Sequence, residues 1–117
     1  MSQPTETKPM RAHKMMTADI AKVEKVKTGH GMTKFLIQNE PGVGANIMVR
    51  YWGPDTNIPI HAHPYDEMWY VLEGEVDFGG QTFTEGEVIY IPAHVPYGPT
   101  TAPKGVSLLR YAEGAGG

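Results

Sequence analysis

Glycine and proline interrupt this 117-residue chain so often that short β-strands are the elements it can most readily form. The sequence has 14 glycines and 10 prolines, and the apolar segments between them are short. Such segments are typical of an all-β barrel or sandwich, and none has the length of a long helix. We expect strands at residues 20–27, 32–38, 45–52, 67–72, 75–78, 81–84, 88–91 and 106–111.

Three glycines mark the most specific turns. Gly79 and Gly80 stand side by side between two expected strands, which favours a tight hairpin because its central positions need positive φ. Gly74 is expected to turn the chain between the strands at 67–72 and 75–78. The strand at 75–78 would then pair back on its predecessor.

The segment from residue 61 to residue 67 reads HAHPYDE and holds the candidate metal ligands. On an extended strand, side chains two residues apart point to one face, so His61 and His63 would share a face. Glu67 is also at an even offset and would join them if the strand stays regular. Two imidazoles and a carboxylate suit iron, zinc, manganese, nickel or copper better than calcium or magnesium. The alternative is a surface loop with incidental histidines.

Glycines flank this segment at characteristic distances. Seven residues separate Gly53 from His61, and six separate Glu67 from Gly74. A second stretch, GEVIYIPAHVPY, follows at residues 86–97. Together these features resemble the two motifs of the cupin family, although the first spacer is seven residues here and usually five.

The resemblance covers about residues 50–111 and implies a fold and a ligand set. The fold is the cupin double-stranded β-helix, a jelly-roll barrel. The ligands are His61, His63 and Glu67, around one divalent transition metal such as iron, zinc, manganese or nickel.

The second motif departs from the family pattern at two positions. Gly86 and Pro92 match, but His94 stands at a family glycine and Tyr97 at a family histidine. That histidine usually supplies the fourth protein ligand. His94 suits the turn because histidine tolerates left-handed backbone better than most residues, and it is a weaker ligand candidate.

Tyr97 has three open roles. As a phenolate it would ligate ferric iron, because a phenol with a pKa of about 10 needs a strong Lewis acid to ionise near neutral pH. As a neutral hydroxyl it would be a catalytic acid–base group beside a three-ligand metal. The third role is packing at a weak or empty site. Trp69 is expected to line the pocket on the Glu67 side, and Tyr65 and Tyr51 are further pocket candidates.

The leading function is a metal-dependent enzyme acting on a small oxygenated organic substrate. A metal held by three protein ligands keeps open positions for a substrate oxygen. We favour proton-transfer or carbon–carbon chemistry of the isomerase, cyclase or lyase class, because Tyr97 is a natural acid–base group. A non-haem iron dioxygenase is an alternative, and so is a non-catalytic cupin that binds a small ligand. Fold alone does not choose between them.

Charge is distributed unevenly along the chain. Residues 51–103 contain no Lys or Arg, so this region is a poor nucleic-acid surface and would disfavour highly anionic substrates. Its eight acidic residues are Asp55, Asp66, Glu67, Glu73, Glu75, Asp77, Glu85 and Glu87.

The length predicts one domain, with an N-terminal arm at 1–16, a barrel at 17–113 and a C-terminal tail at 114–117. We expect a cytoplasmic protein, since no apolar segment approaches the roughly 20 residues of a membrane span and residues 1–14 lack a signal core. The absence of cysteine excludes disulfides and thiolate ligands.

The strand at 67–72 is apolar on both faces. Trp69 and Val71 lie on the Glu67 side, and Met68, Tyr70 and Leu72 lie on the other. A second buried surface would explain this pattern, and exposed apolar patches often mark interfaces. We therefore expect a homodimer; a neighbouring loop or the N-terminal arm is the alternative cover.

Overall fold

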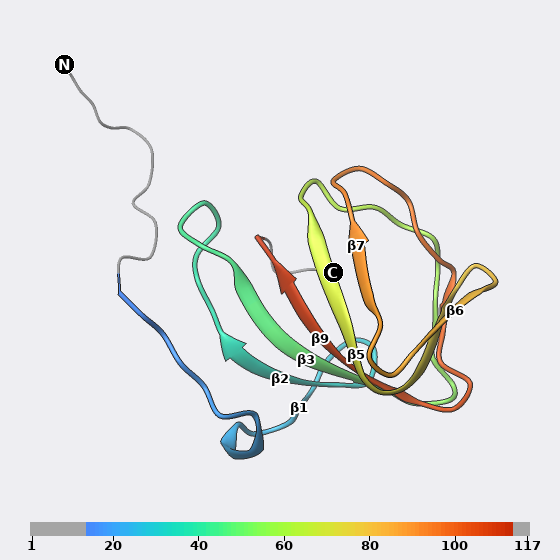
Figure 1. Ribbon diagram of the computed structural model, residues 1–117, viewed down its shortest axis with the longest axis horizontal. Coiled ribbons are helices and arrows are strands. Elements are labelled where there is room, and N and C mark those ends of the chain that lie inside the picture. The colour runs from blue at the N-terminus through green and yellow to red at the C-terminus, as the bar shows by residue number, and fades with distance from the viewer. Residues whose placement is uncertain (1–13, 114–117) are drawn as a thin grey trace.

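The protein is an all-β domain, as the sequence predicts, and the computed structural model describes residues 14–113 (Figure 1). A short 3-10 helix, η1 (Ile20–Lys22), precedes the strands, and no α-helix occurs among these residues. The strands are β1 (Val26–Lys27), β2 (Met32–Ile37), β3 (Asn46–Trp52), β4 (Asn57–Ile58), β5 (Glu67–Phe78), β6 (Gln81–Thr84), β7 (Val88–Ile91), β8 (Thr100–Thr101) and β9 (Val106–Ala112).

Two antiparallel sheets share the long strand β5. The first has the order β1-β2-β3-β9-β5-β7, and the second has the order β4-β8-β5-β6. The twelve residues of β5 reach from one sheet into the other. Figure 1 shows the strands curling around a common interior, with β3, β9 and β5 side by side.

The hairpin expected at Gly79 and Gly80 is confirmed. It joins β5 to β6, and both glycines have positive φ, 63° and 97°. Positive φ at two successive positions is the requirement of a type I′ turn, whose twist matches the paired strands.

The turn expected at Gly74 is wrong, because β5 continues through this residue. Gly74 has a φ of 81°, and a Cβ at this position would lie 2.2 Å from the carbonyl oxygen of Gly105. Glycine is therefore required for the close approach of the loop before β9, not for a reversal of the chain.

The strand expected at 20–27 forms only at its end, as β1. Asp19 caps η1 instead, since its side chain accepts a hydrogen bond from the backbone N–H of Ala21 at 3.0 Å. Lys34 then donates to the Ile20 carbonyl at 2.8 Å and attaches this segment to β2. A capped turn with a tertiary contact here outweighs the alternating pattern. The short strands β4 and β8 had no counterpart among the expected strands.

The side chains of β5 separate into two faces, as expected. Trp69 and Val71 are buried on the inner face, which the curl encloses. Met68 and Tyr70 lie half-buried on the outer face, beside residues of β9 and β7, and Leu72 is half-buried where the register with β9 shifts. We use these two names, inner face and outer face, for the two sides of the sheet formed by β3, β9 and β5.

Residues 1–13 of the expected arm and the whole expected tail, 114–117, lie outside the described residues; residues 14–16 form no helix or strand. Over residues 14–113, the chain has no helix of the length and apolar character that a membrane span requires.

Candidate metal centre

His61 and Tyr97 are paired through their backbones. The N–H of His61 donates to the Tyr97 carbonyl at 3.2 Å, and the N–H of Tyr97 donates to the His61 carbonyl at 3.0 Å. Directly paired residues of antiparallel segments carry neighbouring side chains. The two ring centroids are accordingly 4.8 Å apart, so the tyrosine lies beside the first histidine.

His63 also lies in this group. Its ring centroid is 4.8 Å from that of His61, with the rings edge to face. The regular strand expected from residue 61 to Glu67 is wrong, because the chain bends at residues 64–65 before β5 begins at Glu67. Pro64 accounts for the break, since proline fixes φ and cannot donate to a ladder. A bend, and not even spacing along one strand, positions the glutamate.

Glu67 forms a buried ion pair with Arg110 of β9. Both side chains are 1% exposed, and Oε2 of Glu67 accepts from Nε of Arg110 at 2.8 Å and from Nη2 at 2.7 Å. Charge-assisted bonds of this kind are short and orient both groups. Arg110 therefore fixes the carboxylate through one of its two oxygens.

The second oxygen of Glu67 has no hydrogen bond of regular geometry from the described residues, although the hydroxyl of Tyr97 lies close enough to interact with this carboxylate. This Oε1 is buried and lies 4.0 Å from Nε2 of His63. A buried acceptor without a partner costs about 1–3 kcal/mol, and more when charged. At the tetrahedral angle, zinc bonds of 2.0–2.2 Å hold two ligand atoms about 3.4 Å apart, and about 4.2 Å is reached only if the two bonds are opposite each other. The 4.0 Å between Nε2 of His63 and Oε1 of Glu67 is therefore wider than a tetrahedral ion requires, and the two side chains would have to move closer to share one.

The histidines are in forms that suit ligands. Burial lowers the pKa of His63, which favours the neutral imidazole that a metal requires. Nδ1 of His61 lies 3.0 Å from the Pro59 carbonyl, and a hydrogen bond to it leaves the lone pair on Nε2. Within residues 14–113, however, no three His, Cys, Asp or Glu side chains are gathered closely enough to hold a metal as they stand.

The hydroxyl of Tyr97 keeps its proton in this setting. Burial raises the pKa of Tyr97 well above its usual value, and the negative charge of Glu67 raises it further. A protonated hydroxyl donates a hydrogen bond and is a poor base. In the metal-free protein, Tyr97 therefore has the neutral form.

The other expected pocket residues divide into two groups. Tyr65 stacks on His63 at 5.1 Å between ring centroids, and its hydroxyl lies 3.4 Å from Nδ1 of that histidine. Trp69 is buried on the inner face beside the site. Tyr51, in contrast, lies under Nζ of Lys25 away from the histidines. His94 is exposed at its turn.

The turn interpretation of His94 agrees with its backbone. Its φ is 66°, and among the described residues it is the one non-glycine residue with positive φ. Its N–H donates to the His63 carbonyl at 2.7 Å, so it supports the histidine segment through the backbone. Its side chain does not line the cavity beside the histidines.

A small interior cavity of about 20 Å³ lies on the inner face beside the histidines. A void of this size holds about one water molecule. Its nine described lining residues are Arg50, Trp52, Ile58, His61, His63, Trp69, Tyr97, Thr100 and Arg110.

Arg50 and Arg110 were not among the expected site residues. The sequence pattern could have indicated them. Arg50 is two residues from Trp52 in the strand expected at 45–52, and Arg110 is two residues from Leu108 in the strand expected at 106–111, so each arginine shares a strand face with an apolar residue. An arginine in phase with buried apolar residues is predicted to point inward, where it needs a partner.

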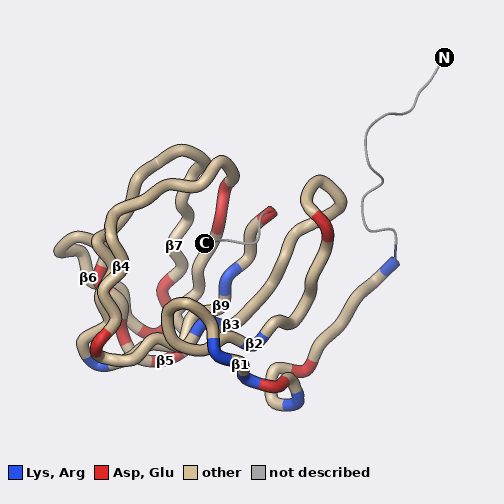
Figure 2. The backbone as a smooth tube through the Cα atoms, turned by 180° about the vertical axis from the view of Figure 1, so that it is seen from behind, with Lys and Arg blue, Asp and Glu red and all other residues tan. Residues whose placement is uncertain are grey.

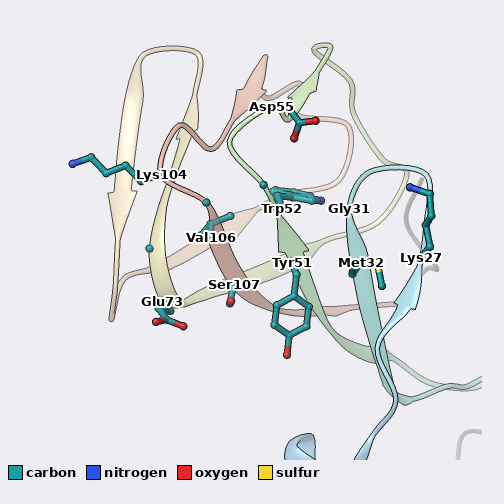
Figure 3. Close-up of a pocket in the computed structure, with 13 residues that line it drawn as sticks. Lys27, Gly31, Met32, Tyr51, Trp52, Asp55, Glu73, Lys104, Val106 and Ser107 are labelled. Carbon is teal, nitrogen blue, oxygen red and sulfur yellow. The ribbon is translucent and has the colours of Figure 1, made fainter.

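A larger cleft of about 850 Å³ lies elsewhere (Figure 3). Its walls come from the ends of β1 and β3, the turn before β2 and the loop before β9, and it carries charges of both signs: Lys27, Asp55, Glu73 and Lys104. None of the candidate ligands His61, His63 and Glu67 lines this cleft. Trp52 lines both spaces and so stands between the cleft and the interior cavity.

The charges follow the two parts of the sheet. Figure 2 shows acidic positions on β5 and in the turn between β6 and β7, while basic positions lie on β1 and on the β3–β9 side. Apart from Glu67, which is buried, and Asp55, which lies in the loop after β3, the acidic block expected at residues 51–103 belongs to the surface of the β5–β7 part. The inner face at the histidines carries arginines instead.

Comparisons with known proteins agree with this architecture. The family model described as the cupin domain matches residues 48–107, which is just over half of the chain. No curated protein matches the chain significantly.

Solved structures with this fold include proteins of several kinds. An RmlC-like cupin from Shewanella frigidimarina has a TM-score of 0.67 at 22% identity, covering 86% of this chain and 96% of that one. The polyketide cyclase RemF from Streptomyces resistomycificus has a TM-score of 0.70 at 19% identity, covering 85% and 79%. HppE in its FeII form has a TM-score of 0.67 at 16% identity, covering 89% and 62%. At these identities the likeness concerns the fold alone.

Proposed function

Because the chain belongs to the cupin family, as its match over residues 48–107 shows, we propose that it is a metal-dependent enzyme acting on a small oxygenated organic substrate. The proposed chemistry is proton transfer or carbon–carbon chemistry, of the isomerase, cyclase or lyase class. One observation carries the proposal: Oε1 of Glu67 is buried without a hydrogen bond of regular geometry from the described residues, 4.0 Å from Nε2 of His63. A carboxylate oxygen in this position is suited to a cation.

The proposed ligands are His61, His63 and Glu67, for one divalent transition metal. When bound, the metal would supply Lewis-acid polarisation of a substrate oxygen. Arg110 orients the Glu67 carboxylate through Oε2, and the Pro59 carbonyl orients the ring of His61. Such outer contacts fix ligand geometry in metal sites.

Tyr97 has the proposed catalytic role. Its hydroxyl is protonated, because burial and the charge of Glu67 raise its pKa, and it would donate a hydrogen bond to an oxygen of the substrate. Trp69 forms an apolar wall at the same cavity and would exclude water from the reacting groups.

The metal site is tested by replacing His61 and His63 together with alanine. The wild type should contain about one metal ion per chain, both when purified without added metal and after dialysis against zinc. The double variant should contain almost none under either condition. Metal should raise the unfolding temperature of the wild type only, since a ligand held at a hundred times its Kd stabilises the folded state by about 2.7 kcal/mol. His94→Ala is the matched control, because this exposed histidine lines no part of the cavity. Unchanged metal content in the double variant refutes the assignment.

The role of Tyr97 is tested by spectroscopy on protein loaded with ferric iron. A phenolate ligand would give a visible charge-transfer band, and a neutral hydroxyl would not. We expect no such band in the wild type and the same spectrum in Tyr97→Phe. With a substrate in hand, Tyr97→Phe should keep the metal and lose about 10²–10⁴ in turnover, the usual contribution of a positioned acid–base group. Full activity in this variant would leave Tyr97 as a packing residue.

A non-catalytic cupin that binds a small ligand is the second candidate. It is favoured by the ion pair, because Arg110 already neutralises Glu67 without a metal. The metal analysis separates the two functions: a chain that binds none of iron, zinc, manganese and nickel is a binding protein. Selective retention of iron would favour the dioxygenase alternative.

A further inference from the structure

The interior cavity is lined almost entirely by groups that donate hydrogen bonds or carry positive charge. Two guanidinium groups, Arg50 and Arg110, and the protonated hydroxyl of Tyr97 face it, and no described lining residue is Asp or Glu. A cavity of this composition attracts negative charge. This is unexpected beside an acidic surface block.

Two of the donors have no acceptor. Nε1 of Trp69 and Oγ1 of Thr100 are buried, on side chains of residues that are 2% and 1% exposed, and neither has a hydrogen-bond partner among the described residues. Buried polar groups normally have partners, so two such donors at one cavity indicate a ligand that accepts hydrogen bonds.

Trp52 has a different position, although its Nε1 also lacks a partner in the described part of the chain. A Cβ at Gly31 would lie 3.2 Å from Cδ1 of Trp52, the atom next to Nε1. Figure 3 shows the indole nitrogen on the side of Gly31. We therefore assign this donor to the cleft side and not to the cavity.

The two arginines differ in their partners. Arg110 is neutralised by Glu67, whereas Arg50 forms no ion pair with any described carboxylate and donates only to the hydroxyl of Thr33, at 3.2 Å. Burial and then the charge of Arg110 lower the pKa of Arg50, and the opposing charge of Glu67 does not offset them. An anion beside Arg50 would counteract this lowering of its pKa.

We propose that the interior cavity binds one anionic oxygen of a small organic carboxylate, between Arg50, Trp69 and Thr100. The cavity has room for about one oxygen atom, so the rest of the ligand extends past the partly exposed His61 and Tyr97. The acidic surface block disfavours multiply charged anions, which leaves a monoanion as the substrate class. The inference deepens the proposed function, and it rests on that function only in calling this ligand the substrate.

Tryptophan emission gives a direct measurement, because the chain has two tryptophans and both line the cavity. Metal-free protein is titrated with acetate and with acetamide, which has the same shape and no charge. A bulky sulfonate, too large for the cavity, holds the ionic strength constant. We expect saturable binding of acetate and at least tenfold weaker binding of acetamide. Equal affinities for the two compounds, or no acetate binding to metal-free or zinc-loaded protein, would overturn the proposal.

Three variants locate the binding. Arg50→Gln should weaken acetate binding at least tenfold, while Lys104→Gln, which removes a positive charge at the cleft, should leave it unchanged. Thr100→Val is nearly isosteric and removes a hydroxyl that has no partner, so it should keep the stability and weaken binding several-fold. This separation of binding from stability distinguishes a ligand contact from a structural role, and it keeps the test decisive if Arg50→Gln fails to fold. Wild-type affinity in folded Thr100→Val and Arg50→Gln would refute the assignment.

Repeating the titrations with zinc-loaded protein separates this inference from the proposed function. Acetate binding that depends on Arg50 in the metal-free protein supports the carboxylate site even if the histidines bind no metal. Acetate binding that appears only with zinc and is insensitive to Arg50→Gln would place the carboxylate on the metal and overturn the inference, while leaving the metal site intact.

Discussion

The inner face of the sheet has charged side chains among its apolar ones at the candidate site, whereas the outer face of the same sheet is apolar there. In most globular domains the enclosed face is apolar and the outer face is polar. Here the inner face holds the buried ion pair of Glu67 and Arg110, with Arg50 nearby. The outer face is apolar over three strands, where Met68 pairs with Tyr111, and Tyr70 with Leu109. The reversal is local, because further along β5 the inner face returns to Val71 and Val76.

This difference indicates that the two faces have different roles. A buried ion pair is a weak source of stability, because desolvation of both charges offsets their attraction. An apolar residue at the same position would pack at least as well. The charges on the inner face are therefore better explained by a ligand or ion that they bind. The apolar outer face is better explained by a second surface that covers it.

The sharpest way to break the comparison is Arg110→Met, which leaves Glu67 buried without its counter-charge. We expect a loss of about 3–5 kcal/mol in the free energy of unfolding, the usual result of removing one partner of a buried pair. Urea denaturation measures it. Lys104→Met, at an exposed lysine, is the control and should change stability by less than about 0.5 kcal/mol.

The double variant Glu67→Gln/Arg110→Met completes this test. With both charges removed, most of the lost stability should return, because the cost lies in the uncompensated carboxylate and not in lost packing. A single variant that loses less than about 1 kcal/mol would show that water reaches Glu67, and the contrast between the two faces would then be much weaker.

The sequence predicted the strands well wherever the local pattern and the tertiary fold agree. The strands at 81–84 and 88–91 have the expected bounds, and the hairpin at Gly79 and Gly80 follows from backbone geometry alone. Gly74 shows the limit. Its need for glycine comes from the carbonyl of Gly105, which is far away in sequence, so local reasoning took it for a turn.

The sequence indicated the histidines and the glutamate of the candidate site, but not their arrangement or the two arginines beside them. The spacing of His61, His63 and Glu67 indicates ligands, but the bend at Pro64 and the pairing with Arg110 depend on how β5 meets β9. The charge of residues 51–103 also gave a wrong expectation for the charge of the site, because the site's two arginines, Arg50 and Arg110, lie outside this range. In a β-fold, the net charge of one sequence segment does not give the charge of a site, because residues from several segments line the site.

The outer face supports a second prediction, that the protein is a homodimer through this surface. Val88 is 62% exposed on β7, next to Tyr70, and we expect Val88→Glu to weaken dimerisation about a hundredfold by placing two acidic groups in an apolar interface. Sedimentation should give about twice the 12.9 kDa chain mass for the wild type and a mass near 12.9 kDa for the variant at micromolar concentration.

A matched control exists for this variant. Val95 is 43% exposed in the loop after β7 and is not part of the outer face, so Val95→Glu should leave the protein dimeric. A wild type that sediments as a monomer at every concentration would refute the dimer and require another explanation for the apolar face.

The smallest expected effect concerns Tyr97 and Tyr90, two tyrosines that each lie beside a carboxylate. On the inner face, burial is the main cause that raises the pKa of Tyr97, ahead of Glu67. At the outer edge, Tyr90 is 61% exposed, and its hydrogen bond to Asp66 is the main cause that raises its pKa. The same bond, followed by one from the N–H of Ala93, lowers the pKa of Asp66.

Tyr90→Phe should therefore raise the pKa of Asp66 towards its ordinary value, without restoring it fully because the bond from Ala93 remains. A lowered carboxyl pKa stabilises the folded state above the ordinary value of about 3.8, and this contribution is lost as the pH falls through the folded-state pKa. The small loss of stability in Tyr90→Phe should thus be present at neutral pH and vanish in acid. Carboxyl titration by NMR measures the shift, with Tyr111→Phe on the same face as the control. If the pKa of Asp66 moves equally in both variants, the cause is a general change of the outer face and not the hydrogen bond, and the distinction between the two tyrosines fails.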